Sequence, residues 1–335
     1  MTTDQLSFKT RPAGRKWFVG AVRCVLPLLM AWVALPASAH NNNAYVANEV
    51  DNTVSVINTV TNAITATVPV GTNPSGIAVS PNGASVYVAN FSSNNISVIN
   101  AATNTVAATV AVGSSPDSVA VSPNGADVYV ANSNANTVSV IDTASNAVVA
   151  TVPVGNSPNS VAISPDGTHV YVANTSDNTV SVIATATNTV TATVPVGNSP
   201  FSVVVSATGA RVYAANFGDG TVSIISTGSN TVTATVPAGS GSYAVAINSD
   251  GARVYVANYN ANSVSILSAA SNSLIATVLV GVSPDAIAVA HNCGLVYVAN
   301  ANSNTVSVIN PSTQAVVATV NVGNVPAAVA TQPTY

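Results

Sequence analysis

Eight side chains of this sequence have the chemistry of a binding site and stand outside its repeating pattern. Five are the aromatic residues Phe91, Phe201, Phe217, Tyr243 and Tyr259, and three are the acids Asp117, Asp219 and Asp285. Aromatic rings give a large contact area at a modest entropic cost, and surface patches of them often mark binding sites. These residues predict an aromatic patch with flanking carboxylates on one face of the protein.

A repeated tetrapeptide, Tyr-Val-Ala-Asn, shows why these eight residues belong together. It starts at Tyr45 and recurs every 42 residues until Tyr297, with Ala214 in place of Val in the fifth of seven copies. Two offsets from the repeat tyrosines hold most of the candidates. Thirty residues after a repeat tyrosine stand Ser75, Asp117, Asn159, Phe201, Tyr243, Asp285 and Ala327, and four residues after one stand Glu49, Phe91, Ser133, Thr175, Phe217, Tyr259 and Ala301.

The elements that position these offsets are four short strands in each repeat. In the unit from Pro116 to Gly155, β-rich segments alternate with turn sequences such as Pro123-Asn124-Gly125. Both faces of the strands are apolar or small, so each sheet needs a neighbour on both sides, which a radial ring of sheets provides. A constant period of this length indicates a repeat architecture, and the sequence predicts an all-β, seven-bladed β-propeller with four-stranded antiparallel blades.

Prolines and chain ends predict how the ring is ordered and closed. Pro69, Pro153, Pro195 and Pro237 fall in fourth strands, and proline is confined to sheet edges, so the fourth strand is expected at the rim and the first strand at the axis. The mature chain opens on a second strand and stops after a first strand. These two fragments are expected to complete one blade and so remove the exposed edges.

In that architecture both offsets lie in loops at one end of the ring, so the candidates are expected to share one face. The alternative is that the aromatic rings fill gaps beneath loops, above all near residues 239–242. Asp117 and Asp285 are four blades apart and are expected to face each other across the channel mouth, poorly placed to act as one acid–base pair.

The charge distribution disfavours nucleic acid as a partner. From His40 onward there is no lysine, and two arginines stand against ten acids, a net charge of −8. Phosphate binding depends on Lys and Arg. Arg211 and Arg253 lie on adjacent blades at the opposite end, where they are expected to solvate hairpins, with anion binding as the alternative.

Familiar catalytic and metal motifs are absent from the sequence. No His/Cys set has metal-ligand spacing, and neither a phosphate-binding loop nor a Gly-x-Ser-x-Gly elbow occurs. Residues 49–52 offer too few carboxylates for a convincing Ca²⁺ loop. We expect no catalytic residue, no metal and no cofactor.

The N-terminus resembles a secretory signal. Basic residues precede an apolar run from Cys24 to Pro36 and the small residues Ala37-Ser38-Ala39. About 13 apolar residues are too few for a membrane span. We therefore expect a signal peptide over residues 1–39, a single propeller over 40–335, and location in the periplasm, on the cell surface or outside the cell. Cleavage leaves Cys293 as the one cysteine, so no intrachain disulfide is expected.

The repeats resemble the YVTN family of β-propeller proteins, with Ala in place of the family's Thr. The resemblance rests on Tyr-Val-Ala-Asn, on Asn-Thr-Val-Ser-Val-Ile (as at 136–141) and on Val-Ala-Val-Ser-Pro-Asn-Gly (119–125). It implies an exported module that binds a protein, peptide or glycan without catalysis, here through the aromatic face. Related propellers include lactonase-like enzymes and a periplasmic DNA-binding member, so the alternative is a hydrolytic enzyme with its site at the channel mouth.

Overall fold

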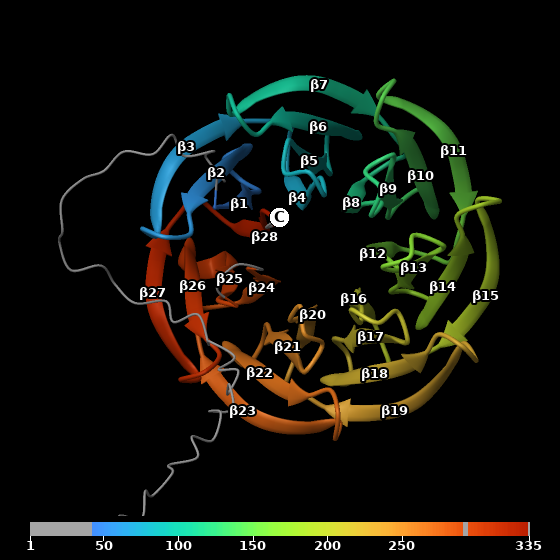
Figure 1. Cartoon of the computed structure of the whole chain (residues 1–335), viewed down its shortest axis with the longest axis vertical. Coiled ribbons are helices and arrows are strands. Elements are labelled where there is room, and N and C mark those ends of the chain that lie inside the picture. Colours follow the sequence, from blue (N-terminus) through green and yellow to red (C-terminus); the bar gives the residue numbers. More distant parts are fainter. Residues whose placement is uncertain (1–41, 291–293, 334–335) are drawn as a thin grey trace, which may run out of the picture. The chain divides into compact units, whose positions relative to one another are not determined.

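The computed structural model describes residues 42–290 and 294–333, which form a ring of seven antiparallel four-stranded sheets (Figure 1). The predicted seven-bladed propeller is confirmed. Blade 1 combines β28 with β1, β2 and β3, so the two chain ends close the ring as expected. The predicted signal peptide (1–39), His291 and Cys293 lie outside the described residues.

The strands fall into four layers from the axis to the rim, in the blade order 1 to 7. The innermost strands are β28 (Pro326–Thr331), β4 (Pro74–Val79), β8 (Pro116–Val121), β12 (Pro158–Ile163), β16 (Pro200–Val205), β20 (Ser242–Ile247) and β24 (Pro284–Val289). The second strands are β1 (Asn43–Asn48), β5 (Ser85–Asn90), β9 (Asp127–Asn132), β13 (His169–Asn174), β17 (Arg211–Asn216), β21 (Arg253–Asn258) and β25 (Val296–Asn300).

The outer two layers complete each blade. The third strands are β2 (Thr53–Asn58), β6 (Asn95–Asn100), β10 (Thr137–Asp142), β14 (Thr179–Ala184), β18 (Thr221–Ser226), β22 (Ser263–Ser268) and β26 (Thr305–Asn310). The outermost strands are β3 (Ala63–Pro69), β7 (Thr105–Ala111), β11 (Ala147–Pro153), β15 (Thr189–Pro195), β19 (Thr231–Pro237), β23 (Ser273–Leu279) and β27 (Ala315–Asn321). One short 3-10 helix, η1 (Ala301–Ser303), follows β25.

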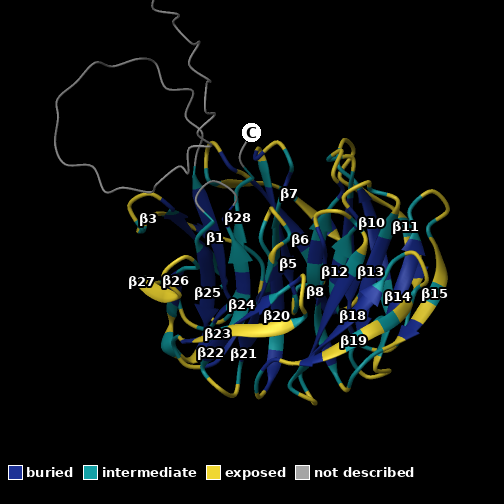
Figure 2. Cartoon of the chain, turned by 60° about the horizontal axis from the view of Figure 1, so that its bottom comes forward, coloured by how far each residue is buried: buried dark blue, intermediate teal, exposed yellow. Residues whose placement is uncertain are grey.

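The prolines lie at the rim as predicted. Pro153 ends the outermost strand β11, and its counterparts end β3, β15 and β19. Among the strands, these outer ones are mostly exposed, whereas the second and third strands are almost wholly buried (Figure 2).

The repeat tyrosines fill the space between blades. All seven are buried, with exposed fractions of at most 4%. Tyr87 of blade 2, for example, packs against Val128, Val130 and Ile141 of blade 3. The role of these tyrosines is therefore structural.

The repeat asparagines join neighbouring strands through their side chains. Asn132 is fully buried and its Nδ2 donates to Thr137 Oγ1 at 3.1 Å and to Ser139 Oγ at 2.9 Å on the next strand. Gly113 packs directly on this side chain, since a Cβ there would lie 2.6 Å from Asn132 Cγ. The amide therefore locks the second strand, the third strand and the loop entering the blade into one unit.

Within the described ranges, no helix is long and apolar enough to cross a lipid bilayer.

Candidate active site

A cavity of about 330 Å³ lies among the innermost strands. We call it the central cavity, and we call the seven side chains that encircle it the ring residues. The ring residues are Ser75, Asp117, Asn159, Phe201, Tyr243, Asp285 and Ala327. Glu49 and Phe91 reach the same cavity from the loops between the second and third strands of blades 1 and 2. Its volume suits a small organic ligand.

Each ring residue occupies a β-bulge at the start of an innermost strand. In blade 3, Pro116 pairs with Asn132 and Ser118 pairs with Ala131, so Asp117 is left out of the pairing. The same skip recurs in the other six blades. A bulge re-aims one side chain while the rest of the strand keeps its packing. The repeat thus presents one variable side chain per blade to the central cavity.

Asp117 and Asp285 have strongly perturbed acidities. Burial raises the pKa of Asp117 to about 7, with a further contribution from the charge of Glu49, while a hydrogen bond with Ser75 opposes the rise. Burial also raises the pKa of Asp285 to about 8, against the lowering effect of a hydrogen bond from Tyr243, and the charges of Asp117 and Glu49 add to it. Both side chains are half-buried.

Asp117 and Asp285 interact electrostatically although they stand four blades apart. Both line the central cavity, and the charge of Asp117 raises the pKa of Asp285. The angle between their blades is large, but the innermost strands converge on the axis. Two carboxyl groups in one cleft whose pKa values are raised toward neutral pH are typical of acid–base sites.

Glu49 is a site residue that the sequence analysis did not select. It stands four residues after Tyr45, at the offset that holds Phe91, Phe217 and Tyr259 in other repeats. As the one acid in that series it could have been singled out. Its blade also contributes the ring residue Ala327.

Four of the predicted aromatic residues form one contiguous cluster. Phe201 stacks on Tyr243 with ring centroids 4.7 Å apart, and Phe217 lies 5.3 Å from Phe201. Tyr259 lies 5.5 Å from Tyr243 and 6.4 Å from Phe217. Phe201 and Tyr243 line the central cavity, and Phe217 and Tyr259 pack behind them. The gap-filling alternative therefore describes this second pair better than the first.

The other two predicted site residues, Phe91 and Asp219, do not belong to this aromatic cluster. Phe91 lines the central cavity from blade 2, on the side of the ring opposite the aromatic cluster of blades 5 and 6 (Figure 1). Asp219 is exposed and does not line the cavity. Its carboxylate accepts hydrogen bonds from the backbone N and Nδ2 of Asn198, both at 2.7 Å. Asp51 and Asp177 bind Asn324 and Asn156 in the same way, so Asp219 serves the loop and not the site.

Tyr243 connects the aromatic cluster to the carboxyl groups. Its hydroxyl hydrogen-bonds to Asp285, and burial together with the nearby carboxylates raises its pKa. Asp285 Oδ1 is buried and has no hydrogen-bond partner among the described protein atoms.

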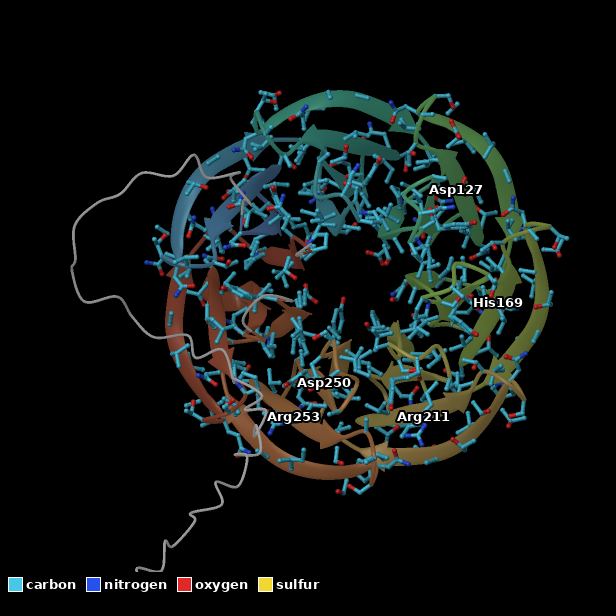
Figure 3. The ribbon with its side chains drawn as sticks, viewed as in Figure 1. Asp127, His169, Arg211, Asp250 and Arg253 are labelled. Carbon is cyan, nitrogen blue, oxygen red and sulfur yellow. The ribbon has the colours of Figure 1, made fainter. Side chains whose placement is uncertain are left out.

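No cation of the described residues balances these acids. Arg211 and Arg253 lie at the opposite end, where their Nη1 atoms donate to the carbonyls of Ala269 (2.6 Å) and Pro311 (2.5 Å). Figure 3 shows both arginines, with Asp127, His169 and Asp250, over the blades and away from the centre of the ring. Across residues 42–290 and 294–333, no three acidic, histidine or cysteine side chains lie close enough to hold a metal ion.

Solved structures with a similar fold include several propellers. Hydrazine synthase of Kuenenia stuttgartiensis matches with a TM-score of 0.74 and 23% identity over 81% of this chain and 93% of that chain. Candidate 6-phosphogluconolactonases of Bacteroides uniformis (TM-score 0.73, 19% identity, 87% and 100%) and Bacteroides fragilis (0.75, 17%, 88% and 99%) also match. Identities this low establish the fold alone.

One curated relative is similar over a short stretch. A PE-PGRS family protein of Mycobacterium tuberculosis is 56% identical over 39 residues, which span 12% of this chain and 8% of that protein.

A family model described as a lactonase, seven-bladed β-propeller, matches residues 35–148, 141–238 and 227–332. This match contradicts the prediction of a non-catalytic binding module and supports its alternative, a hydrolytic propeller. The seven-bladed propeller implied by the resemblance to YVTN repeats is confirmed. The chain belongs to the seven-bladed β-propeller lactonase family.

Proposed function

We propose that this protein hydrolyses a lactone or a related ester in the central cavity. The observation that carries the proposal is the pair Asp117 and Asp285, whose pKa values of about 7 and about 8 lie close to neutral pH while both line one cavity. General acid–base catalysis is most effective when the pKa of the catalytic group lies near the working pH. The family match supplies the reaction class.

Asp117, which has the lower pKa, suits the role of general base. Near neutral pH a large fraction of it is ionised and can take a proton from water as that water attacks the lactone carbonyl carbon. Its neighbour Ser75, whose Oγ lies 3.0 Å from the Pro116 carbonyl oxygen, stands beside the carboxyl group.

Asp285 suits the role of general acid. Its carboxyl group is mostly protonated at neutral pH, and it can give that proton to the ring oxygen as the carbon–oxygen bond breaks. The products are a carboxylic acid and an alcohol on one molecule, and proton exchange with solvent returns Asp117 and Asp285 to their starting forms. Tyr243 positions Asp285 through its hydrogen bond.

Phe91, Phe201 and Tyr243 give the substrate an apolar surface. They line the cavity from opposite sides of the ring, so a ligand between them contacts aromatic rings on two faces. Holding the lactone between rings would bring its carbonyl group to the carboxyl side of the cavity.

The test is a hydrolysis assay of the purified protein with a panel of five- and six-membered lactones and simple esters. Asp117→Asn and Asp285→Asn should each lower kcat/KM by about 100-fold or more, the usual size of a general acid–base contribution. Asp219→Asn, outside the cavity, is the matched control and should retain activity. Hydrolysis that survives both cavity substitutions, or no hydrolysis of any compound, would contradict the proposal.

Within the family, we further propose that the chain is an exported member with YVTN-type repeats. The seven Tyr-Val-Ala-Asn copies and the basic-then-apolar N-terminus support this assignment. Fractionation of cells that express the full chain, with N-terminal sequencing of the product, tests it, and a cytosolic protein that retains residues 1–39 would contradict it.

A further inference from the structure

The central cavity is negatively charged and aromatic at the same time. Glu49, Asp117 and Asp285 line it, and both arginines of the described residues lie at the other end of the ring. Clefts lined by charges of one sign concentrate the opposite charge. A phosphorylated or carboxylated ligand would meet repulsion here with no basic partner, whereas a cation would be attracted.

The aromatic residues narrow the kind of cation. Phe91 faces the cavity from blade 2, and Phe201 and Tyr243 face it from blades 5 and 6. Organic ammonium groups bind over aromatic faces, and enclosure by several rings is the usual recognition site for quaternary ammonium. A bare metal ion needs converging oxygen or nitrogen ligands instead, and the described residues provide no such group of three.

We propose that the central cavity binds an organic ammonium group between Phe91 and the Phe201–Tyr243 pair, with Glu49 and Asp117 as counter-charges. This inference rests on the proposed function: the substrate of the hydrolysis is then a lactone or ester that carries an ammonium group. This reaches beyond the family match, because phosphorylated lactones carry the opposite charge.

The acid groups give this proposal a distinctive signature. The titratable groups that face the cavity or the rings beside it are Glu49, Asp117, Asp285, Tyr243 and Tyr259. A bound cation favours the ionised form of a carboxyl group, so it lowers the pKa of Asp117 and Asp285. Binding near neutral pH should therefore release protons, and affinity should increase as the pH rises through about 7 to 8.

Calorimetry with choline as the probe tests the binding directly, without any need for turnover. The matched neutral compound is 3,3-dimethylbutan-1-ol, which has the same shape with carbon in place of the charged nitrogen. Choline should bind at least about tenfold more tightly than the alcohol, and its heat should depend on the ionisation enthalpy of the buffer because protons are released.

Variants locate the binding site. Phe91→Leu keeps the apolar volume but removes a ring, and it should weaken choline binding about 5- to 30-fold, the range of a cation–π contact. Glu49→Gln should also weaken it. Asp127→Asn removes one negative charge at the opposite end and should leave binding unchanged. Equal affinity for both probes, or full affinity in both the Phe91 and Glu49 variants, would overturn the proposal.

A pair of substrates separates this inference from the proposed hydrolysis. The pair is α-trimethylammonio-γ-butyrolactone and its neutral isostere α-tert-butyl-γ-butyrolactone, with kcat/KM expected to favour the cation by about tenfold or more. Choline binding without hydrolysis of either lactone would refute the hydrolase and leave the cation site standing. Equal hydrolysis of both lactones would refute the cation preference and leave the hydrolase standing.

Discussion

The pH dependence of lactone hydrolysis tests the roles of Asp117 and Asp285 in the most detail. The productive form needs Asp117 ionised and Asp285 protonated. With pKa values of about 7 and about 8, about 60% of the molecules hold both forms near pH 7.5. The same arithmetic gives about 3% near pH 5.5 and near pH 9.5. We therefore expect a bell-shaped profile of kcat/KM that falls about 20-fold on each side.

Glu49→Gln shifts this profile in a defined direction. The charge of Glu49 raises the pKa of both aspartates, so its removal should lower both values and move the optimum to lower pH. Asp285→Asn should remove the alkaline limb, because no acid remains to lose its proton in that range. Asp117→Asn should remove the acidic limb.

The assay measures initial rates of ring opening by chromatography across buffers of constant ionic strength, and circular dichroism checks the fold at each pH. The two limbs belong to the coupled pair, so the variants assign them to residues. A single limb near pH 4, the ordinary range of a carboxyl group, would refute the reasoning. So would an unchanged alkaline limb in Asp285→Asn.

Three further predictions concern stability and specificity. The pKa values of Asp117 and Asp285 are raised in the folded state, so both groups favour folding below their unfolded pKa and lose that contribution as pH rises through about 7 to 8. Asp285→Asn should therefore raise Tm near pH 9 and leave it unchanged near pH 3. Asn132→Ala should lower the free energy of unfolding by about 1–3 kcal/mol in urea titrations. Gly113→Ala should lower the free energy of unfolding less in that background than in the wild type, because the Asn132 side chain that its Cβ would clash with is gone. Asn159→Arg should place a cation in the central cavity, weaken choline binding in calorimetry and move the pH optimum of hydrolysis downward, since a nearby positive charge favours ionised carboxyl groups.

The fold could be predicted almost completely from the sequence because its determinants are local and repeated. A fixed 42-residue period gives the blade, Pro153 and its counterparts identify the rim, and the partial repeats at the two ends predict closure. The role of Asn132 was less accessible. Its partners, Thr137 and Ser139, are visible in the sequence, but the choice of side-chain over turn bonds depends on the packing of Gly113 against the amide.

The site was predictable in position and not in chemistry. The offset of thirty residues after each tyrosine selects the ring residues, but nothing local shows that this offset is a bulge that turns Asp117 inward. Counting blades gives the angle between Asp117 and Asp285. It does not give the width of the central cavity, on which the electrostatic coupling of the two carboxyl groups depends. Asp219 was selected for its nearness in sequence to Phe217, although its carboxylate is already occupied by Asn198.

The bulge explains how one repeat can be both rigid and specialised. Tyr129, Asn132 and Gly113 are each fixed by contacts within or between blades, so changing them damages the scaffold. Asp117, in contrast, is left out of the pairing, and its side chain meets mainly the cavity. Substitutions at the ring residues should therefore alter the acidity of the cavity and the charge of the ligand it prefers, with little change in the fold. The same substitutions two positions further along the strand, at Val119 and its counterparts, would bury a polar group in the core. In this propeller, the residues most free to change are the ones that set its chemistry.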